Sequence, residues 1–385
     1  METEYKIALA IKTEGLEYDD RVRKEILSIK KLYPNIEFKI FAMLPDNKEY
    51  EGVTSYGVPF KAIYLKSRDK YPSAKKVLKK TYEFYKVLKD DLKKFDAVWC
   101  GDYHSVAIAL LCRYKPVLWD LHELPSMLLG NGIKQFILKK TFDNCKVVVH
   151  ANPQRIDYLK SCGCITAPQK HYALRNYPNF EDVDKEYDEK YHAFVEWKAE
   201  RHCVYLQGLT NYSRADKESI EAVLTFPDLV AVVVGGFQPE VRKELEEKYG
   251  QEELKKRVYF VGKIPQLKIP QYVAQCFTTL VFYKNVRPNN YYCEANRFYQ
   301  AVILGLPVVV GNNPPMKDLV EEYNLGVVAN TDGCSVDAIY MALNQVIHSR
   351  VMYLESIQKN KNFLIWDQQE SVIKQIVDKL IDAKK

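Results

Sequence analysis

The 385-residue sequence contains no apolar run of about 18 residues, the length that a membrane-spanning helix needs. Its N-terminus includes Glu2, Glu4 and Lys6 and has no long apolar core, so we do not expect a secretory signal. The loop after the first expected strand lacks Gly-x-Gly-x-x-Gly, and no recognised nucleic-acid-binding module is present. These absences argue against an integral membrane protein, a secreted protein, a dinucleotide-dependent enzyme and a nucleic-acid-binding protein.

Cysteines at the spacing of a zinc site are also missing. The nine cysteines are scattered, and the close pair Cys162 and Cys164 has no second pair that would complete a zinc site. Most of the others lie in apolar segments, where a free cysteine behaves as a small buried hydrophobe. We therefore expect no metal site, and the pattern is typical of a reducing cytoplasm.

Positive charge is concentrated in one segment. The chain has a formal net charge of +6, yet residues 66–94 contain eleven basic and four acidic side chains, so the remaining residues sum to −1. One interpretation is an amphipathic helix that buries an apolar stripe and keeps its lysines in water. The other is a face that rests on anionic lipid or an anionic acceptor. The expected stripe comprises Leu78, Tyr85, Leu88, Leu92 and Phe95.

Short apolar runs alternate with helical patterns, which predicts βαβ units and parallel sheets. In the first half we expect strands at residues 5–11, 37–44, 60–65, 97–100, 116–121 and 146–151, and helices over residues 20–32 and 73–95. In the second half we expect strands at residues 203–207, 229–235, 258–262, 279–283, 307–310 and 326–329.

The alternation predicts two α/β domains. The segment 181–200 has eight acidic and three basic residues and little strand character, so we interpret it as a linker. The domains then span residues 1–180 and 201–365. Residues 366–385 are expected to form a C-terminal helix that could pack back on the N-terminal domain.

Polar groups near strand ends are the candidate ligand-binding groups, because ligands of open α/β sheets bind at the carboxyl ends of strands. A helix is expected to begin near Glu294, after the polar loop 284–292, and its free N–H groups can bind an anion such as a diphosphate. Arg287 and Arg297 could add charge-assisted contacts. Gly305 is suited to a left-handed helix end before the next strand.

A second candidate follows the strand at 203–207. Residues 213–216 have the spacing of a capping box, which places Arg214 and Lys217 near the first turn of a helix. Cations there oppose the helix dipole unless an anion binds. A solvated surface arginine is the alternative for Arg214.

Six segments together resemble one known family. Asn-Arg-Phe-Tyr-Gln-Ala-Val-Ile-Leu-Gly-Leu-Pro-Val-Val at 296–309 is similar to the donor-binding helix of GT-B glycosyltransferases of the GT4 type. The other pieces occur in the order of that family and span nearly the whole chain. They are the loop and first helix at 18–25, Asp-x-His-Glu within 118–124, the segment 174–178, the strand and loop at 205–214, and the nucleobase-bordering loop at 258–265.

The resemblance implies a GT-B fold, α/β in class, with two Rossmann-like domains facing across a cleft. It implies a retaining transfer of a sugar from a UDP- or GDP-sugar to an acceptor hydroxyl, without a metal or other cofactor. The acceptor would be a glycan or a lipid-linked glycan in bacterial surface polysaccharide or glycolipid synthesis. The protein would be cytoplasmic, and peripheral on the inner face of the cytoplasmic membrane if residues 66–94 bind lipid.

The resemblance also implies roles for individual residues. His122 would lie near the donor sugar, with Glu294 as the second catalytic group. The acceptor or phosphate side would comprise Arg21, Asp120 and Glu123. The donor would be bound by Arg214, Lys217, Gly262, Lys263, Ile264, Arg287, Asn296, Arg297 and Gln300. Each has a plain alternative: His122 could be a buried histidine satisfied by Asp120, Arg21 part of a helix-start charge cluster, and Glu294 an acid stabilised by the helix dipole.

The sequence departs from the family at one place. The family often has two glutamates eight positions apart before the glycine and proline, and this chain has Tyr292 and Gln300 there. A glutamine can still donate and accept hydrogen bonds to ribose hydroxyls. The loss of the first glutamate leaves the sugar undefined. It also keeps two alternatives open, a GT-B fold nucleotide-sugar epimerase and a non-catalytic subunit of a synthase complex.

Overall fold

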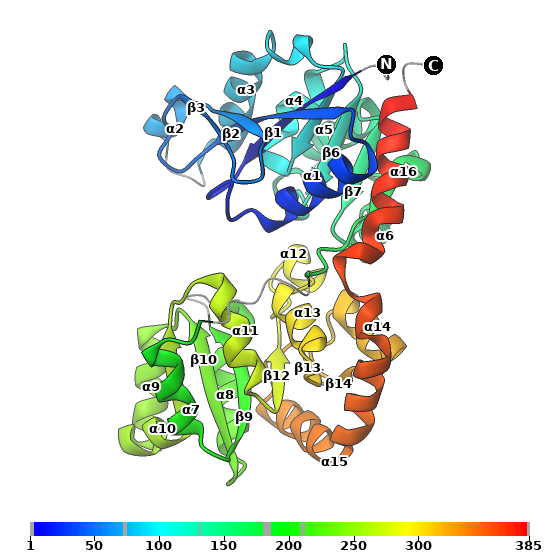
Figure 1. The fold of residues 1–385 in the computed structure, drawn as a ribbon. Helices are drawn as coiled ribbons and strands as arrows, with labels where there is room; N and C mark the ends of the chain where they lie inside the picture. The colour runs from blue at the N-terminus through cyan, green and yellow to red at the C-terminus, as the bar shows by residue number, and fades with distance from the viewer. Residues whose placement is uncertain (1–3, 72–74, 131, 180–185, 209–211, 383–385) are drawn as a thin grey trace. The chain divides into compact units, whose positions relative to one another are not determined.

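The computed structural model describes residues 4–71, 75–130, 132–179, 186–208 and 212–382. The chain forms two compact units (Figure 1). Unit 1 comprises Met1–Asn176 and Gln369–Lys385, and unit 2 comprises Tyr177–Gln368. Residues 181–185 of the expected linker lie outside the described residues. The part that follows is α7 (Glu189–Lys198), which buries Tyr191 and Phe194 in the core of unit 2.

Unit 1 contains an eight-stranded sheet of order β3-β4-β2-β1-β5-β6-β7-β8. Its strands pair in parallel except β3 with β4, as the βαβ alternation predicts for most of them. The short edge strands β3 and β8 were not expected from the sequence. The strands are β1 (Tyr5–Lys12), β2 (Ile36–Met43), β3 (Tyr50–Val53), β4 (Pro59–Ala62), β5 (Ala97–Gly101), β6 (Val117–Leu121), β7 (Val147–His150) and β8 (His171–Ala173).

Helices cover both faces of this sheet. From β1 the chain turns one way to β2 and the other way to β5, so right-handed crossovers place α1 on one face and α3, α4 and α5 on the other. The C-terminal α16 belongs to unit 1 and packs against α1, β7 and β8. The helices are α1 (Asp20–Leu32), α2 (Lys66–Lys70), α3 (Val77–Leu88), α4 (Val106–Leu111), α5 (Gly132–Asn144), α6 (Pro153–Ser161) and α16 (Glu370–Ile381).

The basic segment differs from its expected form. Instead of one helix over 73–95, α3 spans Val77–Leu88 and is followed by a 3₁₀ turn at Leu92–Lys94. Phe84, Leu88 and Leu92 face the core, whereas Leu78 is 43% exposed. The expected stripe is therefore confirmed at Leu88 and Leu92 and wrong at its N-terminal end, where Phe84 takes the inward position instead of Tyr85 and Leu78.

Unit 2 contains a six-stranded parallel sheet of order β11-β10-β9-β12-β13-β14. The strands are β9 (His202–Gly208), β10 (Leu229–Gly235), β11 (Val258–Gly262), β12 (Thr278–Val281), β13 (Val308–Val310) and β14 (Gly326–Val328). Besides α7, its helices are α8 (Asp216–Leu224), α9 (Pro239–Tyr249), α10 (Gln251–Arg257), α11 (Ile269–Ala274), α12 (Pro288–Tyr291), α13 (Asn296–Ile303), α14 (Pro314–Tyr323) and α15 (Val336–Asn360).

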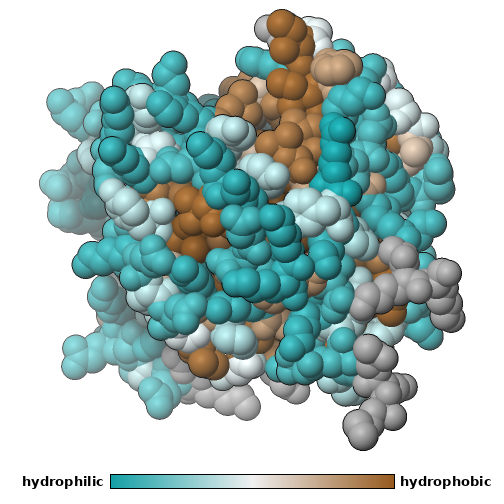
Figure 2. All heavy atoms as spheres, turned by 90° about the horizontal axis from the view of Figure 1, so that it is seen from above, coloured by the Kyte–Doolittle hydropathy of each residue, from teal (hydrophilic) through white to brown (hydrophobic). Residues whose placement is uncertain are grey.

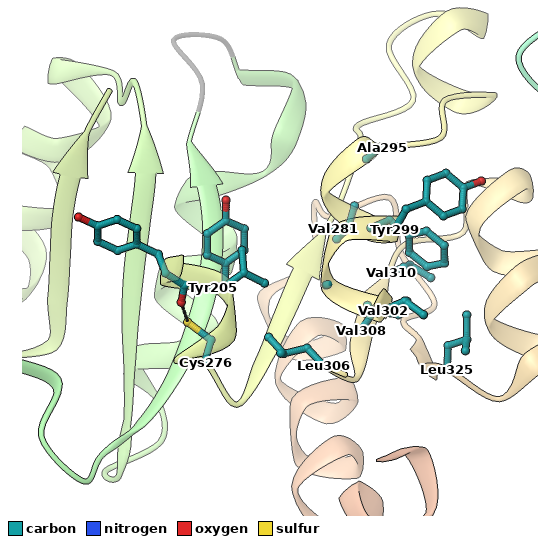
Figure 3. Packing of buried hydrophobic residues seen from close by; sticks show 14 of the residues in the cluster. Tyr205, Cys276, Val281, Ala295, Tyr299, Val302, Leu306, Val308, Val310 and Leu325 are labelled. Carbon is teal, nitrogen blue, oxygen red and sulfur yellow. Dashed lines mark hydrogen bonds between the residues drawn. The ribbon is translucent and has the colours of Figure 1, made fainter. Parts of the chain in front are cut away.

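Two hydrophobic cores hold the helices on the sheet of unit 2. One joins α7, α11, α13 and α14 to alternate residues of the strands, including Tyr205, Val281 and Val308 (Figure 3). The other joins α8, α9, α10 and α15 to the opposite set, such as Leu206 and Val309. Because side chains alternate along a strand, both faces of this sheet are buried.

Two local predictions can be compared with the helix ends. Gly305 has φ +85°, which confirms the left-handed stop after α13. The capping box at 213–216 is wrong: α8 begins at Asp216, and its N-cap is Ala215 in the left-handed region with no side-chain cap. Arg214 lies instead in a 3₁₀ turn at Tyr212–Arg214, just before the helix. Within the described residues, every helix is too short or too polar to cross a bilayer.

Candidate functional site

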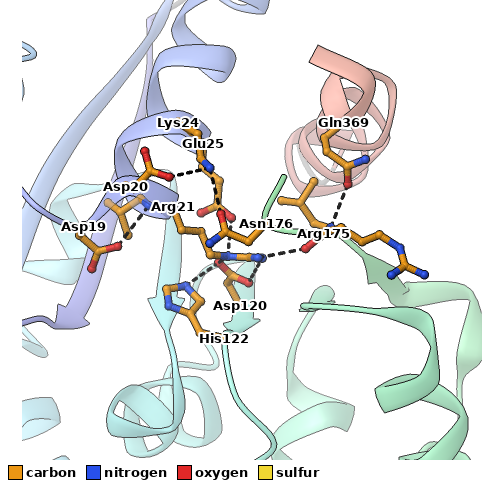
Figure 4. Close-up of polar contacts among 12 residues, drawn as sticks. Asp19, Asp20, Arg21, Lys24, Glu25, Asp120, His122, Arg175, Asn176 and Gln369 are labelled. Atoms are coloured by element: carbon orange, nitrogen blue, oxygen red, sulfur yellow. Dashed lines mark hydrogen bonds and ion pairs between the residues drawn. The ribbon is translucent and has the colours of Figure 1, made fainter. Parts of the chain in front are cut away.

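A buried charge cluster lies at the carboxyl end of β6 in unit 1 (Figure 4). Asp120 is completely buried and accepts two hydrogen bonds from Arg21, from Nη2 at 2.8 Å and Nε at 3.3 Å. His122 Nε2 lies 3.0 Å from Asp120 Oδ2. Arg21, from the start of α1, is 5% exposed and also donates to the carbonyl of Leu174. The structure thus brings Arg21 together with Asp120 and His122, although 99 positions separate Arg21 from Asp120 in the sequence.

Burial and neighbouring charges strongly shift the pKa values of the side chains in this cluster. Burial raises the pKa of Asp120, but Arg21 and His122 outweigh it and hold that pKa below its usual range. Burial lowers the pKa of His122, yet the charge of Asp120 raises it overall to about 9, so the imidazole is a cation at neutral pH. Burial and the nearby Asp120 raise the pKa of Glu25 to about 8. Such perturbed groups at a strand end are typical of functional sites.

The cluster also has the geometry of a metal site. Ligand atoms of Glu25, Asp120 and His122 lie within 4.8 Å of one another. However, Arg21 contacts both carboxylates, with Nε 2.9 Å from Glu25 Oε1. Its guanidinium already supplies the positive charge that a cation would bring, so we interpret the cluster as an ion-pair network that orients His122.

Asp102, which sequence reasoning missed, follows the neighbouring strand β5. Its backbone has φ 54° and ψ −179°, a region that non-glycine residues rarely adopt, and its buried Oδ1 has no hydrogen-bond partner among the described residues. The rings of the next residues, Tyr103 and His104, contact each other with centroids 4.0 Å apart and planes tilted by 32°. Burial and then the charge of Asp102 raise the pKa of Glu123, so the two carboxyl groups share one neighbourhood. The strand-end rule applied to β5 as well as β6 would have identified Asp102.

In unit 2, two arginines flank one aromatic ring after the strand β12. The guanidinium carbons of Arg297 and Arg214 lie 4.9 Å and 5.8 Å from the ring centroid of Tyr283. Arg297 is 4% exposed, donates to the carbonyl of Phe282, and has a buried Nε with no hydrogen-bond partner among the described residues. Arg214 donates to the carbonyl of Gln207, and burial and the charge of Arg297 lower its pKa.

This arginine pair is suited to bind an anion. Neither Arg214 nor Arg297 is ion-paired to a carboxylate in the described part of the chain. Buried charges without counter-charges are costly, because they lose hydration and gain nothing in return. A polyanionic ligand such as a diphosphate would compensate for both arginines at once.

The loop that carries Tyr283 is held by neighbouring residues. The completely buried Asn313 donates from Nδ2 to the carbonyls of Tyr283 and Asn290, at 3.2 Å each. Asp332 accepts a hydrogen bond from the backbone N–H of Asn285. These contacts fix the approach to the N-terminus of α13, near which Arg297 lies.

The other expected donor residues are placed as follows. Lys217 is ion-paired to Glu244 on the surface and is not part of the arginine pair. Glu294 accepts a hydrogen bond from the hydroxyl of Tyr299 at 2.6 Å. Gly262, with φ +77°, ends β11, and the exposed Lys263 and half-buried Ile264 follow it. Arg287 and Asn296 are exposed and Gln300 is half-buried. Residues 209–211, between β9 and Arg214, lie outside the described residues.

One family model matches part of this chain. Residues 208–363 match the family model described as Glycosyl transferases group 1. A search of curated proteins gave no match.

Solved structures that resemble the whole chain include sucrose-phosphate synthase from Thermosynechococcus elongatus, with TM-score 0.76 and 16% identity over 98% of this chain and 100% of that one. HepE from Anabaena in complex with UDP has TM-score 0.68 and 14% identity over 98% and 100% of the two chains. A UDP-forming trehalose-phosphate synthase from Burkholderia xenovorans has TM-score 0.70 and 12% identity over the full length of both. At these identities the likeness shows the fold, and it is the GT-B fold that the sequence predicts.

Proposed function

We propose that this chain is a glycosyltransferase of group 1, the family whose model matches residues 208–363, and that it moves a sugar from a UDP-sugar to an acceptor hydroxyl with retention of the anomeric configuration. The pair of half-buried Arg214 and buried Arg297 carries the proposal, because neither is ion-paired to a carboxylate among the described residues. The structure of HepE in complex with UDP-glucose favours UDP over GDP as the nucleotide.

The chemistry follows from where charge develops. When the bond to the sugar breaks, the diphosphate gains negative charge, and two fixed guanidinium groups and the N–H groups at the start of α13 would stabilise it. We assign this role to protein groups, without a metal. No cofactor is required, since the nucleotide sugar is itself a substrate.

We place the acceptor on unit 1, at the strand ends of β5 and β6. His122 would act near the donor sugar, with Glu294 in unit 2 as the second candidate catalytic group. Arg21 and Asp120 would orient His122, and Glu123 would contact the acceptor. We propose a glycan or lipid-linked acceptor from bacterial surface polysaccharide synthesis, and attachment of the basic segment 66–94 to an anionic membrane.

Calorimetry with UDP tests the donor site. Arg214→Ala and Arg297→Met should each weaken UDP binding by about tenfold or more, because each removes a charge-assisted contact to the diphosphate. Arg242→Ala is the matched control, since Arg242 is an exposed arginine of the same unit, paired to Glu246. Equal affinity of all four proteins for UDP would remove the arginine pair from the site.

Incubation with UDP-sugars tests the reaction itself. Transfer to an added glycan acceptor with the donor configuration kept is the expected result, and nuclear magnetic resonance of the product reports the anomeric linkage. An isomerised donor in the absence of acceptor would instead identify an epimerase. A protein that binds no nucleotide would fit the non-catalytic subunit.

A further inference from the structure

Two large apolar side chains project from one stripe of α5 in unit 1. Ile133 is 76% exposed and Phe136 is 59% exposed, one helical turn apart. The opposite side of α5 packs normally, with Leu138 and Phe142 buried in the unit. Single exposed apolar residues are common on protein surfaces, but two at adjacent positions of one stripe form a small apolar ridge.

Lysines surround this ridge. Lys140 continues the stripe, with its Nζ 5.7 Å from the ring centroid of Phe136, and Lys134 and Lys139 also lie on α5. The one acidic residue of α5, Asp143, lies 3.6 Å from Lys140. The helix thus presents apolar side chains within a positively charged border, which complements an apolar layer covered by anionic groups.

The ridge belongs to a larger surface of the same character. α4 packs against both α3 and α5, so the three helices form one layer over the sheet. On α3, Leu78 and Tyr82 are 43% and 51% exposed, among the lysines of the segment 66–94. Figure 2 shows the molecule from above, where patches of hydrophobic side chains reach the surface between hydrophilic ones. The α3–α4–α5 layer therefore combines exposed apolar groups with the most basic part of the chain.

We propose that α5 anchors unit 1 to an anionic lipid bilayer, with Ile133 and Phe136 entering the interface between headgroups and acyl chains. The exposed lysines of these helices, Lys134 and Lys140 on α5 and Lys79 and Lys86 on α3, contact the lipid phosphates and contribute about fivefold each to the partition constant when they lie near the surface. This inference rests on the proposed function, because a lipid-linked acceptor would be presented to the enzyme at a bilayer. It adds an apolar anchor, on a helix outside residues 66–94.

Co-sedimentation of the full-length protein with vesicles tests the anchor. The wild type should bind vesicles that contain phosphatidylglycerol and should not bind pure phosphatidylcholine, and added salt should weaken the binding. The double variant Ile133→Ser, Phe136→Ser should bind the anionic vesicles about tenfold more weakly or worse, since even partial burial of two such side chains changes the constant by that factor. A blue-shifted emission of Phe136→Trp on anionic vesicles should report entry into the interface.

The matched control is Met341→Ser, Val351→Ser, which removes two equally exposed apolar side chains of α15 in unit 2. It should bind vesicles like the wild type. Three results would overturn the anchor. They are an equal loss of vesicle binding in both double variants, no loss of vesicle binding in either, and a wild-type dimer that the Ile133 and Phe136 changes dissociate. UDP affinity, measured on the same samples, separates this outcome from the proposed function, because a protein that binds UDP but not vesicles refutes only the anchor.

Discussion

Asp120 has no exposed surface, and it stays ionised because Arg21 and His122 replace the water that it loses. The cost of removing either partner is then larger than the value of one hydrogen bond, because a buried charge is left without compensation. The same reasoning applies to His122, whose positive charge depends on Asp120.

This dependence predicts how stability changes with pH. The pKa of His122 is raised to about 9 in the folded protein, so the stability it contributes is present below its unfolded pKa and is lost as the pH rises through about 9. The pKa of Glu25 is raised to about 8 in the folded protein. Its contribution to the stability of the fold therefore also decreases as the pH rises, from about pH 4.5 upward. We expect thermal melts between pH 6 and pH 10 to show a steady fall in Tm.

His122→Asn should flatten the part of this fall that lies between pH 6.5 and pH 9. The effect has an upper bound of about 3 kcal/mol, since one pKa unit corresponds to about 1.4 kcal/mol. His348→Asn, at an exposed position of α15, is the control and should keep the wild-type profile. A wild-type profile in His122→Asn would show that the imidazole does not carry this charge.

Asp102 is the residue for which we expect a kinetic effect without a loss of donor affinity. Its buried Oδ1 lacks a hydrogen-bond partner among the described residues and lies near Glu123 and the rings of Tyr103 and His104, an arrangement suited to a sugar hydroxyl. Asp102→Asn should raise the KM for the acceptor or lower kcat by tenfold or more, with the UDP affinity unchanged. Steady-state kinetics with varied acceptor measure both, and unchanged kinetics would make the strained backbone a purely structural feature.

Single residues differ in how well the sequence predicts them. Arg214 was predicted from its conflict with a helix dipole, although the capping box that suggested it does not form. Asp102 was missed, because an acid after an apolar run looks like an ordinary loop residue. Its positive φ and unpartnered oxygen exist only once the chain has folded.

At the scale of elements, the buried strands were predictable and the two edge strands of unit 1 were not. Continuous apolar runs such as Leu229–Gly235 form strands at the expected positions, because strands buried on both faces must be apolar throughout. The edge strand β3 (Tyr50–Val53) has no such pattern, and its pairing with β4 decides its structure. For α3, helical spacing allowed two neighbouring stripes, and packing selected the one with Phe84.

The C-terminal helix α16 gives a prediction at this scale. It returns to unit 1 and buries Ile376 at 1% exposure, against a sheet built from residues more than 200 positions earlier. Ile376→Ala should lower the free energy of unfolding by about 2–5 kcal/mol, the usual cost of truncating a buried isoleucine. Gln375→Ala, an exposed neighbour on α16, should change it by less than about 0.5 kcal/mol in chemical denaturation.

At the scale of the whole molecule, the two charged features that we assign to function lie in different units. The excess of positive charge lies in residues 66–94 of unit 1, while the arginine pair that we assign to the donor lies in unit 2. Composition alone revealed the first, because exposed charge can be counted. It could not reveal the second, because the pairing of Arg214 and Arg297 around Tyr283 depends on three separate segments of the fold.

The division into units predicts two separable thermal transitions. UDP at one hundred times its dissociation constant should stabilise unit 2 by about 2.7 kcal/mol, because it binds the folded form alone. For a unit of this size that corresponds to a rise in Tm of roughly 5–10 °C. The transition of unit 1 should not move with UDP, whereas Ile376→Ala should lower that transition alone. Differential scanning calorimetry of the wild type and of Ile376→Ala, each with and without UDP, distinguishes the two assignments. A UDP-induced shift confined to the transition that Ile376→Ala lowers would place the nucleotide on unit 1 and refute the donor site at Arg214 and Arg297.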